Sequence, residues 1–199
     1  EPPRHLTKKK RPPASEEDEK KIKESASVWL FPYAALMTGL RKGELLALQW
    51  KDVDFEREEI SVTKSVYYEG NTPKIKAPKS EAGVRTVILL DGLKEELYKR
   101  KGAPNAYIFS EDGGKTPYKE MRYDVLMKQY QKATGVTATA HQLRKSFATI
   151  AAASGVDKKV LQRLMGHTDI RLTLDVYSDV RRSAWDSAKT ILNNTSENL

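Results

Sequence analysis

The feature that most constrains the fold of this chain is a hydrophobic pattern whose period changes twice along 199 residues. Residues 28–40 read VWLFPYAALMTGL, an apolar run that is too short to span a bilayer and is typical of a buried helix ending at Gly39. From residue 52 onwards β-branched and polar residues alternate, and from residue 92 onwards the helical period returns. Because helices lie on both sides of the strand region in sequence, an alternating parallel α/β fold is excluded.

This pattern predicts a mainly α fold with a small antiparallel three-stranded sheet. Strands are expected within DVDFEREEISVTKSV (52–66), where an acidic turn separates two of them, and at VRTVILL (84–90). A helix is expected from Ser15, whose hydroxyl begins a sequence typical of a capping box, to about Ser25. The other helices are predicted at residues 41–50, 92–101, 118–134, 141–153, 158–165, 172–177 and 181–192.

The two ends of the chain are expected to lie outside the folded domain. Residues 1–14 combine prolines with basic side chains, a composition that cannot build a core and is typical of a linker between domains. A chain of 199 residues suits one domain with a tail, and residues 187–199 are expected to be that tail.

Composition limits the classes of function that the chain can have. A formal net charge of +8 and a sequence pI of about 9.4 favour a polyanionic partner such as a nucleic acid. The absence of cysteine excludes disulfides, thiolate nucleophiles and cysteine-ligated zinc, and it favours a cytoplasmic protein. The three histidines are scattered, so no metal site is expected. The sequence also lacks a phosphate-binding GxxxxGK[ST] loop, a GxSxG nucleophile elbow and a membrane-spanning run.

Four short stretches place uncommon polar residues beside apolar helices or strands. They are TGLRKGELLAL with Arg41 and Glu44, KAPKSEAGVRTV with its lysines, HQLRKSFAT with His141 and Arg144, and LMGHTDIRLTLDVYSDV with His167 and Tyr177. Each residue has a structural alternative when it is taken alone: a salt bridge, a solvated turn, a helix cap or a core tyrosine. Together they supply two arginines, two histidines, a lysine and a tyrosine, and the helix start with His141 and Arg144 is suited to binding a phosphate.

With these stretches in this order, residues 15–186 resemble the catalytic domain of the tyrosine recombinases, also called phage-type integrases. TGLRKGELLAL resembles the box of the first catalytic arginine, which implies that Arg41 has this role and that Glu44 supports it. HQLRKSFAT resembles HxLRHxxAT, with Lys145 in place of the second histidine, and LMGHTDIRLTLDVY resembles the box that ends in the nucleophile. The resemblance implies the catalytic residues Arg41, Lys79, His141, Arg144, His167 and Tyr177, with Lys76 as the alternative to Lys79.

The resemblance also implies an activity and its partners. The expected activity is site-specific DNA recombination through a 3′-phosphotyrosyl intermediate, for integration or excision of a phage or mobile element, without a metal ion, a cofactor or ATP. The expected partners are double-stranded DNA, contacted by Lys64, Lys76, Arg85 and Lys145, and further copies of the chain in a tetramer. Without DNA the chain is expected to be a monomer, and no membrane partner is expected.

Three further expectations stay open in the sequence. Family members normally carry a core-binding domain before the catalytic one, so the chain is interpreted as lacking that domain. Residues 181–199 are expected to dock on a neighbouring copy, with packing within the same copy as the alternative. The alternative functions are DNA relaxation of the type IB topoisomerase kind and a catalytically inactive DNA-binding module.

Overall fold

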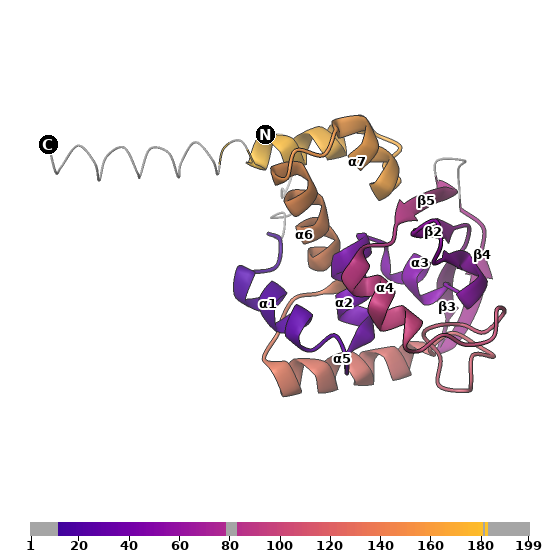
Figure 1. Ribbon diagram of the computed structural model, residues 1–199. Helices are drawn as coiled ribbons and strands as arrows, with labels where there is room; N and C mark the ends of the chain where they lie inside the picture. Colours follow the sequence, from indigo (N-terminus) through magenta and orange to yellow (C-terminus); the bar gives the residue numbers. More distant parts are fainter. Residues whose placement is uncertain (1–11, 79–82, 181, 183–199) are drawn as a thin grey trace, which may run out of the picture.

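The structure is a computed structural model that describes residues 12–78, 83–180 and 182 (Figure 1). The helices are α1 (Glu16–Glu24), α2 (Leu30–Thr38), α3 (Lys42–Leu46), the 3₁₀ helix η1 (Trp50–Asp52), α4 (Asp91–Tyr98), α5 (Glu120–Thr134), α6 (Ala140–Ala153) and α7 (Lys158–Met165). The strands are β1 (Val53–Asp54), β2 (Glu59–Val62), β3 (Ser65–Glu69), β4 (Thr72–Lys76) and β5 (Arg85–Ile88). Residues 170–180 are also helical and follow α7.

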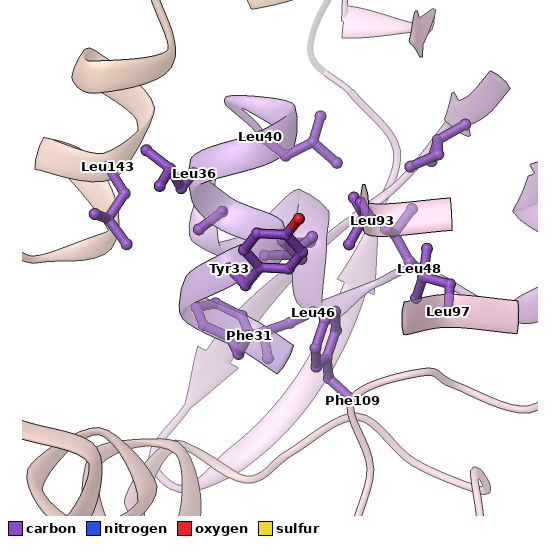
Figure 2. Packing of buried hydrophobic residues seen from close by; sticks show 14 of the residues in the cluster. Phe31, Tyr33, Leu36, Leu40, Leu46, Leu48, Leu93, Leu97, Phe109 and Leu143 are labelled. Carbon is purple, nitrogen blue, oxygen red and sulfur yellow. The ribbon is translucent and has the colours of Figure 1, made fainter. Parts of the chain in front are cut away.

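The apolar run that the sequence singles out forms the centre of the molecule as α2. Its side chains pack against α1, α3, α4 and α6 in the same core as the buried sheet residues, and Figure 2 shows Tyr33 and Leu36 of α2 among Leu93, Leu97 and Leu143. Pro32 lies in the first turn of α2, where its missing N–H costs no intrahelical bond. Gly39 ends the helix in the left-handed conformation, with φ of 64°.

The predicted antiparallel sheet is confirmed, with strand order β1-β2-β5. Ile60 and Val87 are directly opposite each other in this sheet and both are buried, so their face belongs to the main core. A separate two-stranded hairpin is made by β3 and β4, joined by Gly70 and Asn71. Pro73 lies within β4, and its presence is the reason why the sequence pattern did not predict a strand here.

The helices predicted within the described residues are confirmed as elements, and two of them have clearly different bounds. The predicted helix at residues 41–50 ends at Leu46, and Trp50 starts the separate helix η1. The helix predicted at 172–177 runs from residue 170 to residue 180, so the break expected after Tyr177 is absent from the described residues. The helix predicted at 181–192 and the tail at 187–199 lie outside the described part of the chain, apart from residue 182.

The end of the predicted linker contacts the domain. The backbone N–H of Ala14 donates to the hydroxyl of Ser146, which is fully buried on α6, over 3.0 Å. Ser15 then caps α1 by accepting from the N–H of Asp18, as the sequence predicts. None of the helices in the described residues is long and apolar enough to cross a membrane.

Candidate active site

A cleft of about 620 Å³ lies between the start of α3, helix α6, the end of α7 and the helical residues 170–180. Four predicted catalytic residues line it together: Arg41, His141, Arg144 and His167. They come from three segments that are far apart in the sequence. The structure therefore brings together in one cleft four of the six residues that the sequence analysis expects to be catalytic.

Arg41 occupies the N-cap position of α3, directly after the turn that Gly39 makes. Its side chain is half exposed and donates from Nη1 to Glu44 over 2.7 Å and from Nη2 to the carbonyl of Gly166 over 3.1 Å. The same Glu44 accepts from the backbone N–H of Arg41 over 2.9 Å. Glu44 thus fixes both ends of Arg41, while the exposed half of the guanidinium remains open to the cleft.

Arg144 approaches the cleft from α6 with its guanidinium almost wholly buried. It donates to the carbonyl of Gly39 over 2.6 Å and to the carbonyl of Met165 over 2.5 Å. Burial, together with the nearby charge of Arg41, lowers the pKa of Arg144 to about 9, so the guanidinium is still charged at neutral pH. A desolvated cation of this kind interacts more strongly with a phosphate oxygen than an exposed one does.

Glu44 is the carboxylate that joins the cations of the site. Its two oxygens accept from Arg85 over 2.8 and 3.1 Å in addition to Arg41. Burial by itself would raise the pKa of Glu44, but the hydrogen bonds and the charge of Arg85, with those of Arg41, outweigh burial and lower that pKa to about 2. Glu44 thus contacts Arg41, the residue that the sequence analysis expects it to support.

Arg85 does not fit the prediction that it contacts DNA. Its side chain is only 2% exposed because it lies beneath Glu44 and donates from Nε to the carbonyl of Leu164. A guanidinium held in this way cannot reach a backbone phosphate at the surface. The short alternation GVRTV gave no sign of this burial, since an arginine beside a turn is usually solvated.

His167 follows α7 and lines the cleft beside Arg41 and Arg144. Partial burial and the charges of these arginines lower its pKa to about 4, so the ring is neutral at pH 7. Its Nδ1 lies 3.0 Å from the hydroxyl of Thr173, which is fully buried. When this hydroxyl donates to Nδ1, the ring carries its proton on Nε2 and can donate a hydrogen bond to a bound phosphate.

Tyr177 is near this site but does not line the cleft. Its hydroxyl donates to the carbonyl of Val156, and its ring packs against the small cluster formed by Ala148, Ala152, Leu161, Met165 and Val176. The residues that its helix directs into the cleft are Leu172, Asp175, Val176 and Asp179. The predicted nucleophile and the predicted cations are therefore neighbours, but the tyrosine is on the other side of its helix.

The predicted lysines have different environments. Lys79 lies outside the described residues, and Lys76 is exposed at the end of β4, with its ammonium 5.2 Å from the ring of Tyr67. Lys64 is mostly buried and forms a salt bridge with Asp52, so it does not fit the predicted contact with DNA. Lys145 lines the cleft, a position from which it could contact DNA bound there.

Two residues that contribute to the site were not predicted from the sequence. Lys42 lines the cleft next to Arg41, and its ammonium lies 4.0 Å from the centre of the Tyr123 ring. Thr173 orients His167, as described above. Both stand in the motifs already quoted, so their proximity in sequence to Arg41 and His167 was the available signal. No group of three or more potential metal ligands among histidine, cysteine, aspartate and glutamate occurs in the described residues.

Comparison with known proteins gives a consistent result. Residues 15–183 match the model of the phage integrase family. The chain is 29% identical to a tyrosine recombinase XerC-like protein of Caldanaerobacter subterraneus, covering 83% of this chain and 50% of that one. It is 33% identical to the tyrosine recombinase XerA of Thermococcus onnurineus, covering 82% of this chain and 55% of that one.

Among solved structures, the chain is similar to the Tn1549 transposon integrase in complex with transposon right end DNA. The TM-score is 0.68 at 27% identity, covering 92% of this chain and 68% of that one. The chain spans about half the length of the curated relatives it matches.

Proposed function

Since the chain belongs to the phage integrase family, we propose that it carries the catalytic centre of a site-specific DNA recombinase that cuts and rejoins strands through Tyr177. The observation that carries this proposal is the convergence of Arg41, Arg144 and His167 on one cleft whose wall is the helix that bears the tyrosine. We further propose residues 15–186 as the catalytic domain, residues 1–14 as a linker to a core-binding domain, and residues 187–199 as a tail.

The arginines would bind the phosphate that is to be cut. Arg41 and Arg144 each have N–H donors beyond those used within the protein, so they can hold the two non-bridging oxygens of a phosphodiester. As tyrosine attacks, negative charge builds up on these oxygens, and two cations fixed in advance stabilise it. This is the contribution that metal ions make in many phosphoryl-transfer enzymes, and we propose that here the reaction needs no metal.

The remaining groups would move protons. The phenolic oxygen of Tyr177 attacks phosphorus, and its proton passes to His141, which is exposed on the cleft. His167 donates a hydrogen bond to the phosphate. The bond from phosphorus to the 5′ oxygen breaks, and this oxygen takes a proton from Lys79, or alternatively from Lys76. A lysine suits that role because an ammonium gives up its proton far more readily than a guanidinium.

The products would be a 3′-phosphotyrosyl bond and a free 5′ hydroxyl. One phosphodiester is replaced by another, so the energy of the broken bond is kept and no ATP is required. A 5′ hydroxyl of a second duplex attacks the phosphotyrosine and seals a recombinant strand. Two duplexes with two cut strands each require four such sites, so we propose a tetramer on DNA, in which residues 181–199 contact a neighbouring copy.

The test is covalent attachment to a nicked duplex that carries the recombination site. The wild-type protein should form a 3′-linked adduct in the presence of EDTA, and Tyr177→Phe should form none. The variant loses only one hydrogen bond, that to the carbonyl of Val156, so its circular dichroism spectrum should be unchanged.

Three outcomes would contradict this assignment. An adduct formed by Tyr177→Phe would exclude this tyrosine as the nucleophile. Cleavage that stops in EDTA would indicate a metal-dependent nuclease. Relaxation of any supercoiled plasmid, without dependence on a site, would indicate a topoisomerase.

A further inference from the structure

We propose that Arg85 is a positioning residue of this site, which holds Glu44 and the C-terminal end of α7 in the arrangement that makes Arg41 and Arg144 converge on the cleft. The effect of Arg85 on catalysis rests on the proposed function. The orientation of Arg41 and Arg144 by Arg85 can be tested without a recombination reaction.

The first observation is the end of α7, where every free carbonyl finds a donor. The last carbonyls of a helix have no partner within it. The carbonyls of Gln162 and Arg163 accept from the N–H groups of the turn that follows. The next three carbonyls each accept from a different arginine: Leu164 from Arg85, Met165 from Arg144 and Gly166 from Arg41.

These three bonds make the end of α7 a common support for the arginines. A helix C-terminus carries partial negative charge, so it attracts three guanidinium groups that would otherwise repel one another. Successive carbonyls point in different directions because the chain turns here, so each arginine side chain is held in a different orientation. If one carbonyl moves, its neighbours in the same turn move with it, and the other two arginines are displaced.

The second observation is that Arg85 is anchored in the interior, as Arg144 is, but by the carboxylate of Glu44. The side chain of Arg85 is 2% exposed, whereas that of Arg41 is 48% exposed. Arg85 bridges the carboxylate of Glu44 and the carbonyl of Leu164, so it joins α3 to α7 through the sheet strand β5. Arg41 depends on both of these partners, because it bonds to Glu44 and to Gly166.

The third observation is the space left for the guanidinium. Gly166 has φ of 59°, and a Cβ built there would lie 2.9 Å from Nη1 of Arg85. The turn between α7 and His167 is thus shaped around Arg85. Lysine cannot replace it, because one ammonium cannot bond to both oxygens of Glu44 and to Leu164 with the fixed fork geometry of a guanidinium.

The experiment compares Arg85→Lys with Val87→Ala. Val87 is buried on the same strand and has no part in the guanidinium network, so its truncation lowers stability without disturbing the arginines. Glu44→Asp is a second variant that keeps both charges and shortens the bridge by one methylene. It carries the test if Arg85→Lys does not fold, and thermal unfolding followed by circular dichroism identifies the folded variants.

The first readout is the binding of inorganic phosphate, followed by NMR on the ring signals of His141 and His167. Arg85→Lys and Glu44→Asp should bind phosphate about tenfold more weakly, the loss expected for one misplaced charge-assisted hydrogen bond. The second readout is the single-turnover rate of adduct formation at saturating DNA, which should fall about 100-fold with little change in DNA affinity. Val87→Ala should change neither quantity.

The outcomes separate this inference from the proposed function. If both network variants behave like Val87→Ala in the phosphate titration, Arg85 is merely structural and the inference is wrong. A wild-type protein that shows no phosphate binding contradicts it equally, since the arginines then do not converge. If the wild type binds phosphate but never attaches to DNA, the proposed function fails while the titration still decides the role of Arg85.

Discussion

Glu44 shows at the scale of one residue how a buried charge can be necessary without being an energetic advantage. Its carboxylate is desolvated, and only the guanidinium groups of Arg41 and Arg85 compensate for this cost. Two apolar residues could fill the same space with equal or greater stability. The ion pairs are explained instead by their geometry, because they fix the direction in which the N–H donors of Arg41 point.

Glu44→Gln should therefore destabilise the fold strongly. The substitution leaves the guanidinium of Arg85 buried without a counter-charge, which typically costs about 3–5 kcal/mol. The matched control is Glu58→Gln, which breaks the exposed ion pair with Lys94 and should cost at most about 1 kcal/mol. Urea denaturation measures both values. Equal losses in the two variants would show that burial of the Glu44 pair is energetically unimportant.

His167 predicts a pH dependence of stability that can be assigned to one residue. Its pKa is about 4 in the folded chain against 6.5 without the fold, so the unfolded chain binds more protons between these values. Stability should then decrease as the pH falls from 6.5 to 4, by on the order of 1–3 kcal/mol. Glu44, whose folded pKa is about 2 against 4.5, adds its own loss only below about pH 4.5.

Urea unfolding midpoints measured from pH 7 to pH 4.5 test this prediction. The variant His167→Gln, which cannot titrate in that range, should give a flatter curve than the wild type. If the two curves are parallel, the pH dependence comes from other groups, and His167 does not need to be neutral for the chain to fold.

At the scale of elements, the end of α7 determines the site more than any complete helix does. The turn at Gly166 receives Arg41, directs His167 towards the cleft and leaves space for Arg85. A glycine is required here for two reasons, the left-handed backbone conformation and the guanidinium of Arg85 beneath it. Only the second reason concerns function.

Gly166→Ala separates these two reasons when it is compared with Gly155→Ala. Both glycines have positive φ, but an added Cβ at Gly155 meets nothing within 4 Å, whereas at Gly166 it meets Arg85. Gly155→Ala should cost about 1–2 kcal/mol from backbone strain alone. Gly166→Ala should cost clearly more in thermal unfolding and should also slow adduct formation. If the two variants are equally stable and active, Arg85 adapts to the added methyl group.

At the scale of the whole molecule, the buried apolar residues fall into two clusters of very different size. The main cluster, part of which Figure 2 shows, includes α2, the sheet and most helices. Tyr177 packs against the small cluster of α6, α7 and Val176. For Tyr177 to reach a phosphate held by Arg41 and Arg144, its helix must rotate or leave this cluster. Few apolar contacts oppose that movement.

Native-state hydrogen exchange should therefore show that residues 170–180 open before the main core. Their amides are expected to exchange at a lower opening free energy than those of buried Leu45 and Val62. Binding of a DNA duplex should change protection in residues 170–180 and leave the sheet unaffected. If residues 170–180 are as protected as the sheet, delivery of Tyr177 requires global unfolding, which would contradict the proposed mechanism.

The sequence by itself determined the order of the helices in the described residues, the three-stranded sheet and, through the resemblance of its motifs, the short list of candidate catalytic residues, but not the hairpin of β3 and β4. These depend on local rules: hydrophobic period, helix caps and motifs of neighbouring residues. Arg41 with Glu44, and His141 with Arg144, could be paired because residues three apart share a face of a helix.

Only the tertiary structure decided which of these residues meet and which way they point. Arg85 and Glu44 are 41 positions apart, so no local pattern indicated their ion pair or the burial of Arg85. The same holds for Tyr177, whose motif identified the residue but whose hydroxyl bonds to Val156 instead of facing the cleft. The direction of a side chain depends on packing between segments distant in sequence, which local rules cannot specify.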